Sequence, residues 1–219
     1  MNKYKLYMLS GLGFDERIFS NLEITNADIE YLKWLEPDDN ETLTNYVKRI
    51  SEQIEVTEQP IILLGHSFGG IIVQEISKLI PVNKIILLSS VKSEYEMPLR
   101  IRTMKFLPLY KFLNKDLILK SFPVWARLFG YNSEKGRNLF VQMISNSSNN
   151  YLRWSLKTIS EWKQTNKKLP ELIQIHGTRD KTFPLKFIKR PIIVEDGSHF
   201  MVYSKAEEVS RIINNTLLT

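Results

Sequence analysis

A serine stands between two glycines in the segment Gly65–Gly69 (GHSFG), directly after a short apolar run. A helical pattern begins at Phe68, which predicts that Ser67 lies at a sharp turn from a strand into a helix. Side chains two positions to either side of such a turn would collide with its neighbours, and Gly65 and Gly69 supply the room. At a helix N-terminus, unpaired N–H groups favour developing negative charge. The pattern therefore favours a serine nucleophile, with the Phe68 N–H as an oxyanion donor.

A serine hydroxyl is a weak nucleophile unless a general base accepts its proton, and the chain has three histidines. His66 adjoins Ser67, so its side chain is expected to point away from the serine hydroxyl. His176 ends a predicted strand just before Gly177, and we expect it to be packed and hydrogen-bonded there. His199 lies in a predicted loop between the last strand and the last helix. By elimination we predict His199 as the base.

The base requires an acid that orients it. Asp180 follows a predicted strand, which places it at the carboxyl edge of the sheet. Glu195 and Asp196 are closer to His199 in the sequence and are the alternatives. We favour Asp180, because a loop neighbour three residues away can rarely reach back to the imidazole.

A second oxyanion donor should come from the loop after the first predicted strand. That loop, Ser10–Asp15, contains two glycines, so its backbone can approach a substrate closely. We predict the Leu12 N–H as this donor. An ordinary turn between a strand and a helix is the alternative interpretation of the same residues.

Apolar runs typical of strands buried on both faces alternate with helical patterns over most of the chain. We predict strands at Tyr4–Leu9, Ile29–Leu32, Ile61–Leu64, Ile85–Leu88, Leu172–Ile175 and Ile192–Val194. Helices are predicted at Leu43–Ile54, Phe68–Leu79 and Ala206–Leu217. The alternation indicates an α/β fold with a parallel sheet and helices on both of its faces.

Residues 91–168 interrupt this alternation with a helical pattern. Helices are predicted at Met104–Phe112, Leu117–Phe129, Gly136–Ile144 and Tyr151–Trp162, with a surface loop at Ser145–Asn150. A helical insertion after one strand of a parallel sheet is most simply a cap over the carboxyl edge, where such sheets bind ligands. We therefore expect a core formed by residues 1–90 and 169–219, with a helical cap at residues 91–168.

The predicted cap is rich in aromatic and basic residues. It has 15 Lys and Arg against 5 Asp and Glu, so its local net charge is +10. Its apolar side chains either line an acyl or aromatic pocket or simply pack the cap: Phe106, Leu107, Leu109, Tyr110, Phe112, Leu113, Phe122, Trp125, Leu128 and Phe129. Its basic side chains steer an anionic substrate, touch a membrane surface or form a solvated face: Arg100, Arg102, Lys105, Lys111, Lys115 and Lys120.

Composition excludes several classes of protein. The 219 residues are 43% hydrophobic and 25% charged, the balance of a globular protein with one large domain or a core with an insertion. The absence of cysteine excludes disulfides, thiolate metal sites and a cysteine nucleophile. No apolar run is long enough to span a bilayer and the first residues lack a signal-peptide pattern, so we expect a cytoplasmic protein. The net charge of the chain is +6, but residues 91–168 carry +10 and the remainder carries −4, a distribution that argues against a nucleic-acid partner.

Four segments, taken in order, resemble the α/β-hydrolase superfamily over nearly the whole chain. They are Gly11-Leu12-Gly13, Gly65-His66-Ser67-Phe68-Gly69-Gly70, His176-Gly177-Thr178-Arg179-Asp180 and Gly197-Ser198-His199-Phe200-Met201. The resemblance implies a catalytic triad with Ser67 as nucleophile, Asp180 as acid and His199 as base, in the family's chain order. It also implies an oxyanion hole formed by the Leu12 and Phe68 amides.

The resemblance implies a mostly parallel sheet of about six strands with a helical cap, and without two N-terminal strands that are common in the family. Ser10 stands where many members have a histidine before the oxyanion glycine, a difference that bears on loop geometry more than on activity.

The implied activity is that of a small serine esterase or thioesterase that forms an acyl-enzyme on Ser67 from a small-molecule acyl substrate. An acyltransferase, a lyase or a catalytically silent ligand-binding protein on the same fold is the alternative. No cofactor, metal, nucleic-acid partner or stable membrane insertion is implied. The sequence determines neither the acyl group nor the oligomeric state.

Overall fold

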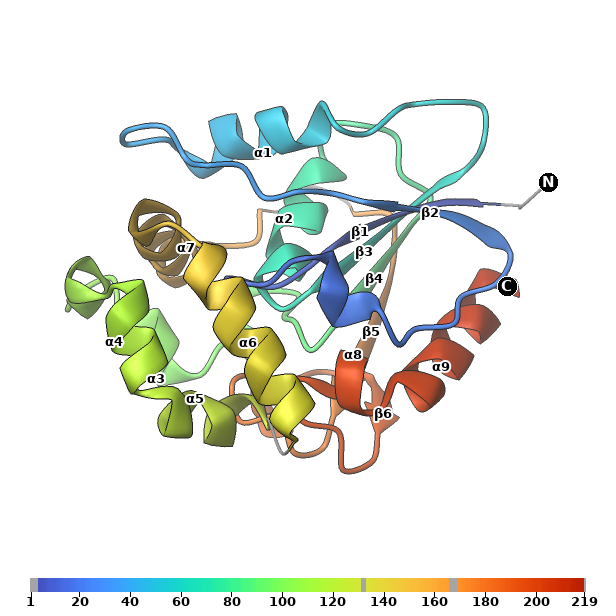
Figure 1. Ribbon diagram of the computed structural model, residues 1–219. Coiled ribbons are helices and arrows are strands. Elements are labelled where there is room, and N and C mark those ends of the chain that lie inside the picture. The colour runs from blue at the N-terminus through green and yellow to red at the C-terminus, as the bar shows by residue number, and fades with distance from the viewer. Residues whose placement is uncertain (1–3, 131–132, 166–168, 219) are drawn as a thin grey trace.

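The computed structural model describes residues 4–130, 133–165 and 169–218, apart from the side chains of Leu109 and Leu128. Within these ranges the strands form one sheet in the order β2-β1-β3-β4-β5-β6, and every pairing is parallel (Figure 1). The strands are β1 (Tyr4–Leu9), β2 (Ala27–Tyr31), β3 (Ile61–His66), β4 (Lys84–Leu88), β5 (Glu171–Gly177) and β6 (Ile192–Val194). The predicted α/β fold with about six strands is confirmed.

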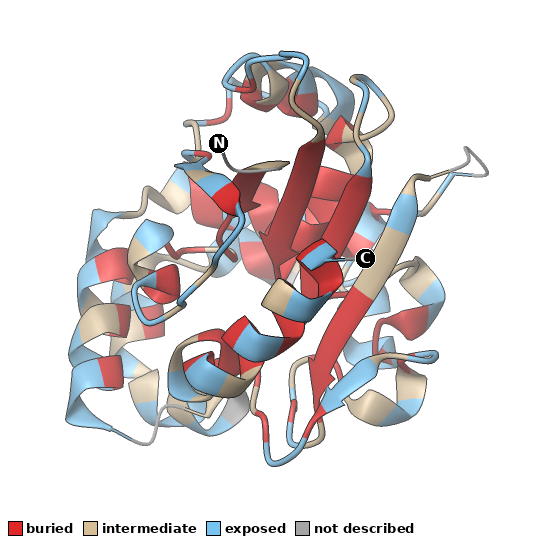
Figure 2. Cartoon of the chain, turned by 90° about the vertical axis from the view of Figure 1, so that its right-hand side faces the viewer, coloured by how far each residue is buried: buried red, intermediate tan, exposed pale blue. Residues whose placement is uncertain are grey.

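The centre of the sheet is buried on both faces. Every residue of β3 and β4 is buried, which explains why these strands are continuous apolar runs in the sequence. The edge strands β2 and β6 are short and partly exposed. Figure 2 shows this contrast between buried central strands and a partly exposed periphery.

Helices cover both faces of the sheet, because alternate residues of each strand point to opposite sides. Leu6 and Met8 of β1 belong to the core cluster that includes α9 (Ala206–Leu218) and α8 (Met201–Ser204). Tyr7 and Leu9 belong to the cluster that includes α1 (Leu43–Ser51) and α2 (Phe68–Ile76). In Figure 1, α1 and α2 accordingly lie on one side of the sheet and α8 and α9 on the other.

Between β4 and β5 the chain forms a group of helices that lies to one side of the sheet (Figure 1). They are α3 (Leu99–Arg102), α4 (Lys115–Lys120), α5 (Phe122–Phe129), α6 (Glu134–Asn146) and α7 (Asn149–Glu161). No helix among the described residues is long and apolar enough to cross a membrane.

Three predictions for this segment are wrong. The expected helix Met104–Phe112 contains only a 3-10 turn at Leu109–Phe112, because Pro108 cannot donate a helical hydrogen bond. The expected helix Leu117–Phe129 is divided into α4 and α5, with Pro123 in the first turn of α5. The expected loop at Ser145–Asn150 is largely helical.

That loop is short because α7 begins early. The Ser148 hydroxyl accepts a hydrogen bond from the Tyr151 N–H and caps the helix, while α6 continues to Asn146. The other predicted strands and helices are confirmed, with differences only at their ends.

Candidate active site

Ser67 occupies the turn between β3 and α2 in a conformation that is unusual for a residue with a side chain. Its φ is 52° and its ψ is −119°. Hydrogen bonds on both sides of the residue hold this conformation. The Ser67 N–H donates to the Leu88 carbonyl at 2.9 Å, and the Ser90 hydroxyl donates to the Ser67 carbonyl at 2.6 Å. The end of β4 therefore fixes the turn that presents Ser67.

The two glycines of the motif allow the backbone to pack closely around this turn. A Cβ atom on Gly65 would lie 2.5 Å from the backbone of Gly70, and one on Gly69 would lie 2.3 Å from the Ser10 carbonyl oxygen. Such contacts with backbone atoms cannot be relieved by a side-chain rotation. The steric reason predicted for both glycines is confirmed.

The structure brings Ser67, His199 and Asp180 together in one hydrogen-bonded chain. His199 Nε2 lies 2.9 Å from Ser67 Oγ, and His199 Nδ1 lies 2.8 Å from Asp180 Oδ2. Because an ionised carboxylate only accepts hydrogen bonds, Nδ1 carries the proton and Nε2 is left to accept one from the hydroxyl. The alternative Asp196 instead pairs with Arg179 at 2.8 Å in an exposed position, and Glu195 is exposed.

Asp180 is buried, yet its environment favours the charged form. Its Oδ1 accepts hydrogen bonds from the Thr182 and Phe183 N–H groups at 2.8 and 2.9 Å. Burial by itself raises the pKa of Asp180, but His199, the nearby His176 and the backbone donor of Phe183 lower this pKa below its usual value. Asp180 is therefore ionised at neutral pH, as an orienting acid requires.

The predicted oxyanion loop lies directly against the serine. A Cβ atom on Gly11 would be 3.1 Å from Ser67 Cβ, so only glycine lets the loop approach this closely. Neither the Leu12 nor the Phe68 N–H donates a hydrogen bond to another described residue.

Ser10 organises this loop through two hydrogen bonds. Its hydroxyl donates to the Phe14 carbonyl at 2.7 Å and accepts from Trp34 Nε1 at 3.0 Å. The loop is thus closed on itself and tied to the segment after β2. These bonds account for a defined loop geometry without the histidine that many family members have at this position.

Side chains cover the site almost completely. Ser67 is 9% exposed and His199 is 1% exposed. The Phe129 ring, at the end of α5, lies 5.3 Å from the His199 ring, and the Phe183 ring, in the loop after β5, lies 5.6 Å from it. The Phe129 carbonyl also accepts a hydrogen bond from the Phe200 N–H, which docks α5 on the loop of His199.

The apolar residues expected either to line a pocket or to pack the cap have different positions. Phe106, Leu107 and Phe112 are exposed, so for them both alternatives are wrong. The others with described side chains are buried or pack against a core: Tyr110, Leu113, Phe122, Trp125 and Phe129. The side chains of Leu109 and Leu128 lie outside the described part of the chain.

A cleft of about 370 Å³ lies beside the predicted oxyanion loop, Ser10–Asp15. Ser10, Gly13 and Phe14 form one wall, and Trp34 and Tyr151 line it as well. Ser67 is not among the residues that line this cleft.

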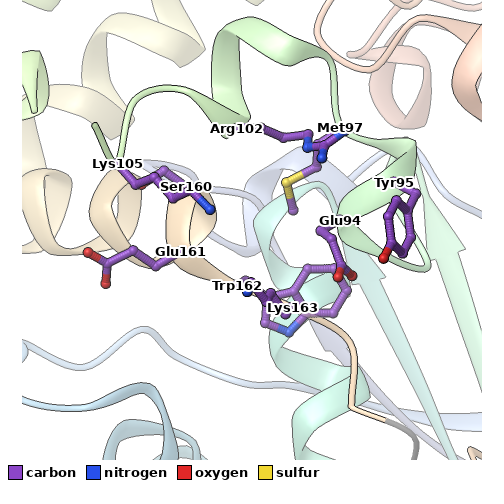
Figure 3. A pocket seen from close by; sticks show the side chains of 9 residues that line it. All are labelled: Glu94, Tyr95, Met97, Arg102, Lys105, Ser160, Glu161, Trp162 and Lys163. Atoms are coloured by element: carbon purple, nitrogen blue, oxygen red, sulfur yellow. The ribbon is translucent and has the colours of Figure 1, made fainter. Parts of the chain in front are cut away.

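A second pocket, of about 190 Å³, lies at the end of α7 (Figure 3). It is lined by Arg102 and Lys105 together with Glu161 and Trp162, and by none of the predicted site residues. No group of three or more His, Asp or Glu in the described ranges is arranged to hold a metal ion.

Sequence reasoning missed how close the other two histidines lie to this site. His66 Nε2 is 2.9 Å from the His199 carbonyl oxygen, and His176 Nε2 is 2.7 Å from the Phe183 carbonyl oxygen and 3.4 Å from Asp180 Oδ2. The expected packing of His176 at its strand end is confirmed. A signal was present in the sequence, because each of these histidines ends or nearly ends a strand that leads into a predicted site residue.

A model of the alpha/beta hydrolase family matches residues 9–212. The chain belongs to this family. Its parallel sheet agrees with that assignment, and the resemblance noted in the sequence is confirmed. No curated protein matches the chain in sequence.

Several solved structures share the fold at low sequence identity. The esterase from Exiguobacterium antarcticum has a TM-score of 0.76 and 17% identity, and the match covers 99% of this chain and 92% of that one. YbtT, a type II thioesterase from the yersiniabactin pathway, has a TM-score of 0.66 and 14% identity over 97% and 92%. RedJ, a thioesterase from the prodiginine pathway of Streptomyces coelicolor, has a TM-score of 0.68 and 13% identity over 97% and 90%.

Proposed function

We propose that the chain is a serine hydrolase that cleaves an ester or thioester of a small acyl substrate through an acyl-enzyme on Ser67. The hydrogen-bonded chain from Asp180 through His199 to Ser67 carries this proposal. It joins three segments that are far apart in the sequence, and it provides the base and the orienting acid that a serine nucleophile requires.

In the proposed reaction, Ser67 Oγ attacks the acyl carbonyl while His199 Nε2 accepts its proton. The Leu12 and Phe68 amides stabilise the negative oxygen of the tetrahedral intermediate. His199 then returns the proton to the leaving group, and the C–O or C–S bond breaks to give the acyl-enzyme. A water molecule, activated by His199, releases the acid and regenerates Ser67. Asp180 keeps the imidazole in the required tautomer throughout.

We further propose that residues 91–168 act as a cap over a core formed by residues 1–90 and 169–219. Two contacts support this division: Phe129 of α5 lies against His199, and Ile144 of α6 packs against Gly13 of the oxyanion loop. Because Ser67 and His199 are covered, a substrate reaches the serine only when the covering side chains move.

The similar structures favour ester or thioester bonds as targets. They include an esterase and two thioesterases, at sequence identities of 13–17% to this chain. Acyl transfer, lyase chemistry and ligand binding without catalysis are the competing outcomes of the following test.

The test uses a fluorophosphonate probe, which reacts with an activated serine without assuming a substrate. We expect the probe to modify Ser67, as located by mass spectrometry, and we expect Ser67→Ala and His199→Ala to abolish the labelling. Ser145→Ala, at an exposed serine of α6, is the matched control and should label like the unchanged protein.

A panel of p-nitrophenyl esters and acyl thioesters of graded chain length then identifies the bond that is cleaved. Labelling without hydrolysis of any of them would favour transfer or lyase chemistry. A folded protein that does not label would contradict the proposed function and favour a binding role.

A further inference from the structure

His66 is a buried polar side chain that the proposed reaction does not use. It is the last residue of β3 and is completely buried. Its Nε2 lies 2.9 Å from the backbone carbonyl oxygen of His199, and the two imidazole rings are 5.3 Å apart. The residue next to the nucleophile is therefore bonded to the backbone of the base.

The protonation of His66 follows from its surroundings. Burial, together with the proximity of His199, lowers the pKa of His66 to about 3, so the ring is neutral at physiological pH. A carbonyl oxygen only accepts hydrogen bonds, so the single ring proton is on Nε2. Nδ1 is then an acceptor, and no described residue donates to it.

The unpaired nitrogen faces the oxyanion loop. A Cβ atom on Gly11 would lie 2.8 Å from His66 Nδ1 and 3.1 Å from Ser67 Cβ, so the loop passes across both residues. The Phe14 ring lies 6.1 Å from the His66 ring. One rigid imidazole thus lies among the nucleophile, the oxyanion loop and the base. Buried polar atoms usually have a hydrogen-bond partner, and among the described residues Nδ1 of His66 is an exception.

We propose that His66 is a positioning residue that holds the backbone of His199, and through it the imidazole, at hydrogen-bonding distance from Ser67. The proposal rests on the serine-hydrolase function proposed above. His199 lies in a loop between β6 and α8, whereas every residue of β3 is buried in the centre of the sheet. The hydrogen bond from His66 therefore transfers the rigidity of the sheet centre to a loop residue. A displacement of about 1 Å at such a site lowers the rate of reaction about 100-fold.

The test compares two substitutions of nearly equal shape. Glutamine places an Nε2 donor where the histidine has one, and methionine has the same length without a donor. We expect His66→Gln to keep kcat and the rate of fluorophosphonate labelling within about threefold, and His66→Met to lower both by about 10- to 100-fold. KM should change less than twofold in either variant, because His66 does not touch the substrate.

A second measurement does not depend on turnover. The proton between His199 Nδ1 and Asp180 Oδ2 should give a low-field NMR resonance, which His66→Gln should retain and His66→Met should broaden or shift. Full activity in folded His66→Met would overturn the proposal, and so would equal losses in both variants at unchanged thermal stability. If the unchanged protein does not label at all, the proposed function fails first and His66 has no base to position.

Discussion

The turn that presents Ser67 and the segment from Leu99 to Phe129 differ in what determines their backbone conformation. At the turn, Gly65 and Gly69 contact backbone atoms so closely that no side chain fits, and hydrogen bonds with Leu88 and Ser90 hold a positive φ at Ser67. In the helical segment the helices are short, and Phe106 and Phe112 are 78% and 77% exposed. The sheet therefore holds the turn of Ser67, whereas exposed positions of the helical segment should tolerate substitution.

The largest effect should come from Asp180, the carboxylate that we propose orients the base. We expect Asp180→Asn to lower kcat about 10⁴-fold, because the amide no longer holds His199 in the tautomer that accepts the serine proton. Hydrolysis of the best ester or thioester from the panel measures this. Asp196→Asn, at the exposed alternative acid, should stay within twofold, and similar losses in the two variants would contradict our choice of Asp180.

The two regions should differ in how much a substitution lowers the free energy of unfolding. Gly69→Ala places a methyl group 2.3 Å from the Ser10 carbonyl oxygen, and we expect the free energy of unfolding to fall by about 3 kcal/mol or more. Phe106→Ser, at an exposed position, should change it by less than about 0.5 kcal/mol. Urea unfolding followed by circular dichroism distinguishes these values. A larger loss from Phe106→Ser would show that the helical segment is packed against something the monomer does not contain.

The smallest effect concerns pH. Burial lowers the pKa of both His66 and His176 in the folded state, so between their unfolded pKa near 6.5 and their folded pKa the unfolded chain binds more protons. The contribution of these two histidines to the free energy of unfolding is then fully present above about pH 6.5. It falls by about 1.4 kcal/mol per pH unit for each histidine as the pH decreases from there toward the folded pKa.

Unfolding by urea at pH 7, 6 and 5 measures this slope. His66→Gln removes one titrating group, so its slope should be shallower by about the contribution of one histidine. An unchanged slope in this variant would show that the pKa of His66 is the same in the folded and the unfolded protein, contrary to the low pKa assigned to it.

The strands and the neighbourhood of Ser67, His199 and Asp180 could be predicted because their signals are local. A buried parallel strand requires a continuous apolar run, and a tight turn around a serine requires glycines at two exact positions. The helical segment gave weaker signals. Its apolar residues have the period of a helix, but Pro108, Pro123 and the Ser148 cap decide where the helices begin and end.

The sequence by itself determined the family and the succession of strands and helices along the chain outside residues 91–168. It also determined the residue types available for a nucleophile, a base and an acid. Only the tertiary structure decided that Phe129 lies on His199, that Phe106 and Phe112 are exposed, and that His66 and His176 bond to the segments of the base and the acid. These contacts join residues up to 133 positions apart in the chain. Sequence patterns report local periodicity and steric limits, whereas long-range contacts arise from how complete elements pack.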